Sequence, residues 1–134
     1  MIIGIGNDLA NIERIKKSIE KFGQRFINKI FSAEEQAELS KRQKISAHEY
    51  ACSAARRFAA KEACSKALGT GFKQGIFWSD LIITHTPAGK PELQLRGAAA
   101  KRLAALSGNA SCRLHVTMTD DYPWAQAFVI IEAL

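Results

Sequence analysis

Three charged side chains in two segments of the sequence have the chemistry needed to act on a phosphate. Asp8 follows a short apolar run, whereas Glu62 and Lys66 lie four residues apart in a segment that contains neither glycine nor proline. Two carboxylates from separate elements can hold one hard cation, and Mg²⁺ is often bound by only one or two carboxylates, with water and substrate phosphates completing the shell. Lys66 would then neutralise charge that develops on the phosphate or protonate a leaving group.

Each of these residues also has a common structural explanation. Asp8 can be a turn or N-cap residue that precedes a helix. Glu62 and Lys66 can form a surface ion pair in the favourable i, i+4 orientation, which stabilises a helix by about 0.2–0.5 kcal/mol. Phe58 shares their helix face, four residues before Glu62. The functional hypothesis therefore requires that Glu62 face Asp8, and spacing alone leaves that open.

The elements that must position these residues begin with a short strand over residues 2–5. In this strand Gly4 and Gly6 allow another backbone to approach closely. Apolar residues then recur at helical spacing from Ile12 to Phe26, which predicts a helix after the strand. A capping box that begins at Ser32 predicts a second, short helix to about residue 39, followed by a polar loop over 41–45.

The longest predicted helix covers residues 47–68 and carries both Glu62 and Lys66. A second capping box, from Ser46 to Glu49, opens it, and Gly69 is well placed as its C-terminal cap. Its many alanines favour helix and let a neighbouring element pack closely.

The rest of the chain changes to strand periodicity. We expect strands over residues 76–83 and 92–95 around a turn at 86–91, and a helix over 97–106. Two more strands follow, over 114–119 and 125–131. This order predicts one α+β domain, 1–134, with a mixed, largely antiparallel sheet packed on a long helix.

The 134 residues carry a formal net charge of +6, which is distributed unevenly. Residues 11–31 hold six basic and two acidic side chains, and residues 41–73 hold eight basic and two acidic ones. Such blocks attract phosphates or an acidic partner. A nucleic-acid-binding domain is one alternative, but Phe22, Phe26 and Phe31 are expected in the core and no RNP, KH or zinc-finger pattern is present. A non-catalytic module that docks an acidic partner is another.

Composition excludes several other classes. With 47% apolar and 24% charged residues, the chain is globular rather than disordered. No apolar run approaches the roughly 18 residues of a membrane span, and Asp8 comes too early for a signal peptide. Cys52, Cys64 and Cys112 form no CxxC motif and cannot all pair, so we expect reduced thiols in the cytoplasm.

Several segments together resemble the phosphopantetheinyl transferases of the holo-acyl-carrier-protein synthase family. Each segment is modest by itself, but the set is specific in its order and spacing and covers nearly the whole chain. The segments are Ile3–Asp8 with Ile12 and Arg14 downstream, Arg57–Gly71, Gly89–Pro91, His115–Thr119 and Ala125–Glu132.

The resemblance implies a Mg²⁺-dependent enzyme that moves phosphopantetheine from coenzyme A to a serine hydroxyl of apo acyl carrier protein. Adenosine 3′,5′-bisphosphate would be the second product, and the reaction would support fatty acid biosynthesis. Members of the family are usually homotrimers with active sites at subunit interfaces. Neither nucleic acid nor a membrane is expected as a partner.

The resemblance also implies roles for individual residues. Asp8 and Glu62 match the metal ligands and, with Lys66, form the catalytic set. The residues matched to coenzyme A binding are Arg57, Phe58, Lys61, Lys66, Gly69, Thr70, Gly71, Lys90 and Pro91. Those matched to carrier-protein docking are Arg14, Lys21, Arg25 and Phe26.

Two points stay open at the level of sequence. Asp8 or Glu62, through a metal-bound water, is expected to take the serine proton, and the sequence does not choose between them. Asp120 stands where many family members have a histidine before an acidic residue. A carboxylate cannot replace that histidine as a hydrogen-bond donor to phosphate.

Overall fold

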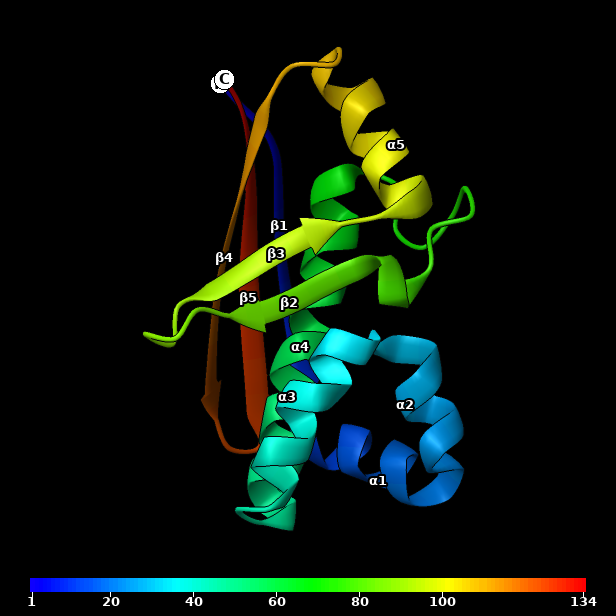
Figure 1. Ribbon diagram of the computed structural model, residues 1–134, viewed down its shortest axis with the longest axis vertical. Helices are drawn as coiled ribbons and strands as arrows, with labels where there is room; N and C mark the ends of the chain where they lie inside the picture. Colours follow the sequence, from blue (N-terminus) through cyan, green and yellow to red (C-terminus); the bar gives the residue numbers. More distant parts are fainter.

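The long helix α4 (Ala47–Leu68) is the element around which the rest of the chain packs in the computed structural model, which describes residues 1–134. A three-stranded antiparallel sheet lies along it, with the strand order β1 (Ile2–Asn11), β5 (Trp124–Ala133) and β4 (Cys112–Asp121). A separate antiparallel hairpin, β2 (Leu81–His85) and β3 (Pro91–Leu95), crosses in front of the sheet (Figure 1). The predicted α+β class with antiparallel pairing on a long helix is confirmed.

Strand β1 contacts α4 through backbone rather than side chains. A Cβ at Gly4 would lie 2.2 Å from the carbonyl oxygen of Ala67, and one at Gly6 would lie 1.7 Å from that of Ala63. Only glycine allows this approach, as the sequence predicts. The strand continues to Asn11 instead of ending at residue 5, because β5 pairs with it along this length. Asp8 therefore lies within the strand and not in a turn after it.

The basic segment after β1 forms two helices instead of one. Helix α1 (Ile12–Phe22) begins at the N-cap Asn11, whose side chain accepts a hydrogen bond from the backbone N–H of Arg14. Gly23, with φ of 57°, interrupts the periodic pattern, and α2 (Gln24–Ile30) follows at a new angle. Phe31 is buried as expected, but Phe22, the last residue of α1, is 49% exposed, and Phe26 is only half-buried, so two of the three expected core aromatics lie at the surface.

The capping signals place the next two helices well. Ser32 and Glu35 form the predicted capping box of α3 (Ala33–Gln43). This helix continues beyond Leu39, so part of the predicted loop is helical, and the basic side chains of its last turn lie where the helix dipole favours them. Helix α4 has the predicted bounds, with Ser46 as N-cap and Gly69 as a left-handed C-cap.

Two apolar clusters share α4. One lies between its C-terminal half, the large sheet, the β2–β3 hairpin and α5 (Gly97–Ser107), and the other lies between its N-terminal half and α1 to α3. The predicted strand over 76–83 is partly a 3₁₀ turn, η1 (Trp78–Asp80), before β2. No helix has both the length and the apolar character to cross a membrane.

Candidate active site

Asp8, Glu62 and Lys66 line one pocket of about 430 Å³ between β1, α1 and α4. Lys66 Nζ donates to Asp8 Oδ1 at 2.8 Å and to the carbonyl oxygen of Asn7 at 3.2 Å. The lysine thus reaches across to the strand and makes its ion pair with Asp8 rather than with Glu62, its neighbour on the helix. Asp8 lies at least 54 residues before Glu62 and Lys66 in the sequence. The fold brings the two carboxylates and the lysine together, as the functional hypothesis requires.

The charges in this pocket perturb one another. Burial and then the negative charge of Asp8 raise the pKa of Glu62, and Lys66 opposes this only in part. The hydrogen bond to Asp8 raises the pKa of Lys66, with the charges of Asp8 and Glu62 adding to it. Glu62 is therefore protonated more readily than an ordinary glutamate, and Lys66 stays protonated.

The donor set of the pocket fits a hard divalent cation. Two carboxylates from facing elements, with no third His, Cys, Asp or Glu grouped with them, suit Mg²⁺, which keeps several waters and takes further oxygen ligands from substrate phosphates. Burial and, after it, the repulsion from Asp8 raise the pKa of Glu62, and a cation bound between the two carboxylates would relieve the repulsion.

Basic and aromatic residues of α1 and α2 form the opposite wall of this pocket. Arg14 and Phe26 line it together with the catalytic candidates. Phe26 and Arg25 also line an adjacent surface hollow of about 260 Å³, beside the exposed Phe22. Lys21 lies with its ammonium 5.2 Å from the Phe22 ring centroid. Of the four residues matched to carrier docking, Arg14 and Phe26 thus line the catalytic pocket, Arg25 lines the adjacent hollow, and Lys21 lies against Phe22 at that hollow.

An aromatic stack joins the pocket to the segment that follows α4. Phe58 lines the pocket and stacks on Trp78 at 4.8 Å between ring centroids, and Trp78 stacks on Phe72 at 3.7 Å. The Gly69–Gly71 segment, which includes Thr70, lies between Lys66 and Phe72 in the chain. The stack therefore holds this segment at the end of α4 that carries Lys66.

Arg57 lies on the other side of α4. It lies nine residues, or two and a half helical turns, before Lys66, so the two side chains point to opposite sides of the helix. Arg57 lines a different pocket of about 470 Å³ with Lys41, Arg42 and His85. Its guanidinium is buried, and its Nε and Nη1 have no hydrogen-bond partner. The positive charges of Arg57, Lys41 and Arg42 make this pocket suited to an anion.

Lys61 does not belong to either pocket, which corrects its assignment to coenzyme A binding. Its ammonium is fully buried, donates to Glu35 Oε1 at 2.7 Å and to the carbonyl oxygen of Trp78 at 2.9 Å, and also donates to that of Leu81. All three N–H donors are thereby used, so none is available to a phosphate. The residue ties α4 to α3 and to the start of β2.

Lys90 and Pro91 lie at the exposed β2–β3 turn, whose opposite limb, Thr86 and Pro87, lines the Arg57 pocket. They are thus near the Arg57 side of the molecule rather than the Asp8 pocket. Asp120 lines neither of these two pockets and forms an ion pair with Arg56 at 2.6 Å.

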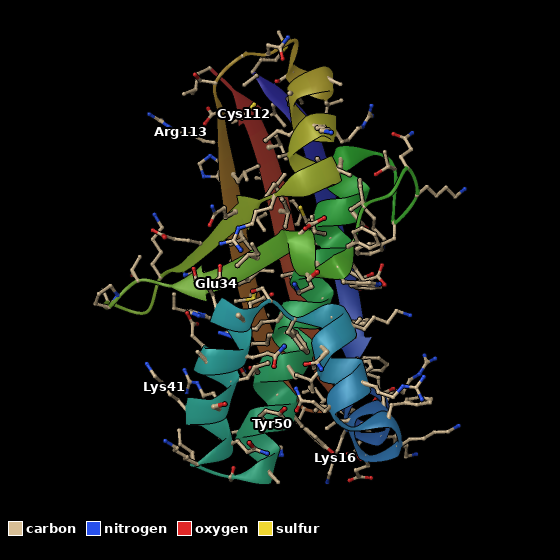
Figure 2. All side chains as sticks on the ribbon, turned by 45° about the vertical axis from the view of Figure 1, so that its right-hand side comes forward. Lys16, Glu34, Lys41, Tyr50, Cys112 and Arg113 are labelled. Atoms are coloured by element: carbon tan, nitrogen blue, oxygen red, sulfur yellow. The ribbon has the colours of Figure 1, made fainter.

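Sequence reasoning missed Glu38 and His85, which contact Arg57 from α3 and β2. No local signal identifies them, because these contacts span 19 and 28 residues. In the sequence, Lys41 and Arg42 stand out only as members of the basic block over residues 41–73. Figure 2 shows Lys41 on α3 pointing away from the body of the molecule toward solvent.

Comparisons with known proteins identify the family of this chain. A family model for the 4′-phosphopantetheinyl transferase superfamily matches residues 4–127. The chain is 56% identical to a holo-[acyl-carrier-protein] synthase of Rhizobium rhizogenes, with 100% of this chain and 97% of that protein covered.

Solved structures are similar as well. The crystal structure of holo-[acyl-carrier-protein] synthase from Neisseria meningitidis superposes with a TM-score of 0.80 at 37% identity, covering 98% of this chain and 99% of that one. The Helicobacter pylori enzyme in complex with coenzyme A has a TM-score of 0.78 at 27% identity, covering 96% and 99%. The chain therefore belongs to the 4′-phosphopantetheinyl transferase superfamily, as a member of its holo-[acyl-carrier-protein] synthase group.

Proposed function

We infer that this chain transfers 4′-phosphopantetheine from coenzyme A to a serine hydroxyl of apo acyl carrier protein and releases adenosine 3′,5′-bisphosphate. The observation that carries this inference is the pocket in which Asp8 and Glu62 flank Lys66 beside a basic, aromatic rim. This pocket brings together groups that can stabilise the charge of a phosphate, accept a proton and attract an acidic protein. The homologues named above carry the same activity in their names.

In the proposed reaction the serine oxygen attacks the β-phosphorus of the pyrophosphate, and the bond from that phosphorus to the bridging oxygen breaks. Lys66, the exposed cation of the pocket, would move from Asp8 to the phosphate oxygens and stabilise the charge that develops there. One of the two pocket carboxylates, Asp8 or Glu62, would take the serine proton.

Asp8 and Glu62 would also hold the Mg²⁺ ion. When bound, the ion supplies Lewis-acid stabilisation of the pyrophosphate and lets carboxylates and phosphates share one pocket.

Coenzyme A binding is assigned to both sides of α4. Lys66, Phe58 and the Gly69–Gly71 segment would hold it on one side. The charges of Arg57, Lys41 and Arg42 make the other side attractive to phosphate, with Lys90 and Pro91 nearby. A single coenzyme A reaches both sides most simply when a second copy of the chain brings its Arg57 pocket to the Asp8 pocket of the first.

A homotrimer with sites at its interfaces is the assembly we propose. The face of the large sheet that points away from α4 supports it, because that face carries exposed apolar side chains where a monomer would favour polar ones. These side chains are Ile5, Leu9, Trp124 and Phe128.

The rim formed by Arg14, Lys21, Arg25 and Phe26 is assigned to the acidic carrier protein. Their positive charges would steer it to the pocket, and Phe26 would contact an apolar side chain beside the target serine. We place the activity in the cytoplasm, in support of fatty acid biosynthesis.

The direct test is to incubate the chain with apo acyl carrier protein, coenzyme A and Mg²⁺ and to measure the mass of the carrier. We expect the mass to increase by one phosphopantetheine, and we expect EDTA to abolish the increase and Glu62→Gln to reduce it sharply. If no carrier protein gains mass, the proposed function is wrong.

A further inference from the structure

Glu38 of α3 forms a hydrogen-bonded cluster with Arg57 and His85 at the edge of the Arg57 pocket. Its Oε1 accepts from Arg57 Nη2 at 2.6 Å and lies 2.8 Å from His85 Nδ1, and its Oε2 accepts from the backbone N–H of His85 at 3.2 Å. The carboxylate is thus fixed from two elements, α4 and β2. Burial opposes its ionisation, but the hydrogen bonds from His85 and the charge of Arg57 hold the pKa of Glu38 below its usual range.

Fixing one nitrogen of a guanidinium restricts the whole group, because its five donors lie in one rigid plane. Arg57 donates from Nη2 to Glu38, and its guanidinium is buried at the wall of a pocket that Lys41 and Arg42 also line. The arginine is therefore held in place by a carboxylate through one nitrogen, and its charge adds to that of the pocket. Two basic residues beyond this pair keep the pocket attractive to an anion despite the carboxylate.

We propose that Glu38 is a positioning residue for Arg57, holding its guanidinium at the wall of the pocket that would receive a phosphate group of coenzyme A. The proposal rests on the proposed function. The opposite role is that Glu38 merely occupies the arginine until a phosphate displaces it. The two roles differ in sign, since removing a positioning residue weakens coenzyme A binding, whereas removing a competitor strengthens it.

The test measures the Kd for coenzyme A by calorimetry, together with kcat and both KM values, for the full chain and its variants. Glu38→Ala is expected to raise the Kd and KM for coenzyme A about tenfold, as for a lost hydrogen bond to a charged group. We expect kcat and the KM for carrier protein to stay within about twofold. Glu38→Gln should restore most of the affinity, because its amide oxygen still accepts from Arg57.

A double-mutant cycle decides whether Glu38 acts through Arg57. In an Arg57→Ala background, Glu38→Ala should have no further effect on the Kd for coenzyme A. Glu34→Ala, which removes an exposed glutamate of the same helix paired with Arg96, is the matched control and should bind coenzyme A like the wild type. If Glu38→Ala fails to fold, Glu38→Asp keeps the charge, shortens the reach by one methylene and should raise the same Kd.

Three outcomes overturn the proposal: an unchanged or lower Kd for coenzyme A, an equal rise in both KM values, or a Glu38→Ala effect that persists without Arg57. These results are distinct from a failure of the proposed function. A wild-type chain that modifies no carrier protein contradicts the transferase activity, whereas active variants that bind coenzyme A like the wild type contradict only the role of Glu38.

Discussion

Helix α4 supplies the lysines of two lysine–carboxylate ion pairs that differ in solvent exposure and in the number of their other hydrogen-bond partners. The Lys61–Glu35 pair has both side chains 0% exposed, and Glu35 also accepts from the backbone N–H groups of Ser32 and Ile83. In the Lys66–Asp8 pair the side chains are 53% and 18% exposed, and Lys66 has one other protein partner, the carbonyl oxygen of Asn7.

The difference separates a structural ion pair from one that can be rearranged. A buried pair whose donors and acceptors are all used cannot release its lysine without leaving an uncompensated charge in the core. An exposed pair contributes about 0–1 kcal/mol, so its lysine can exchange a carboxylate for a phosphate at little cost. We therefore expect substitutions at the two lysines to affect different properties.

The largest expected effect is on stability at Lys61. Lys61→Met leaves the Glu35 carboxylate buried without its counter-charge, which should lower the free energy of unfolding by about 3–5 kcal/mol in urea denaturation. The double variant Lys61→Met with Glu35→Gln removes both charges, keeps an acceptor for the backbone N–H groups of Ser32 and Ile83, and should regain part of that loss. A single variant as stable as the wild type would contradict the structural role.

Lys66→Met should show the reverse pattern. Losing a cation that stabilises developing charge is expected to lower kcat about 10²- to 10³-fold, while the free energy of unfolding changes by less than about 1 kcal/mol. Lys101→Met, at an exposed position of α5, is the control and should leave kcat unchanged. A Lys66 variant that is destabilised as much as the Lys61 variant would remove the distinction between the pairs.

A third cation, Arg14, sharpens the comparison because it lines the same pocket as Lys66. Arg14→Glu is expected to raise the KM for carrier protein about fivefold, or roughly 1 kcal/mol, with a smaller change in the KM for coenzyme A. Lys16→Glu makes the same charge reversal on another side of α1 and should have less effect. Equal changes in both KM values for Arg14→Glu would count against the docking assignment.

The smallest effect concerns Glu62 and the pH dependence of stability. Its folded-state pKa is raised above the ordinary 4.5, so its ionised form is disfavoured in the folded state. The wild type should therefore lose stability as pH rises through 4.5 toward the folded-state pKa, whereas Glu62→Gln should not. Without divalent metal, we expect the variant to have the higher Tm at pH 7 and a similar Tm at pH 4. A lower Tm at pH 7 would show that Glu62 is net stabilising there.

Local signals predict some of these features and miss others for physical reasons. The bounds of α4 follow from its caps, which are encoded within a few residues of each end. The length of β1 depends on its pairing with β5 more than a hundred residues away, and short-range periodicity does not report it. Lys61 and Lys66 both match the family signature, but burial by α3 and β2, which no spacing rule contains, separates their roles.

The glycine contacts between β1 and α4 set how the strand and the helix are aligned beside the catalytic pocket. Two strand residues advance about 6.6–6.8 Å and four helix residues about 6.0 Å, so Gly4 meets Ala67 and Gly6 meets Ala63 in successive steps. At the next step the strand presents Asp8, and its side chain requires the two backbones to separate, which is where the pocket opens. The positions of Asp8 on the strand and Glu62 on the helix are thus set relative to each other by main-chain contacts rather than by side-chain packing.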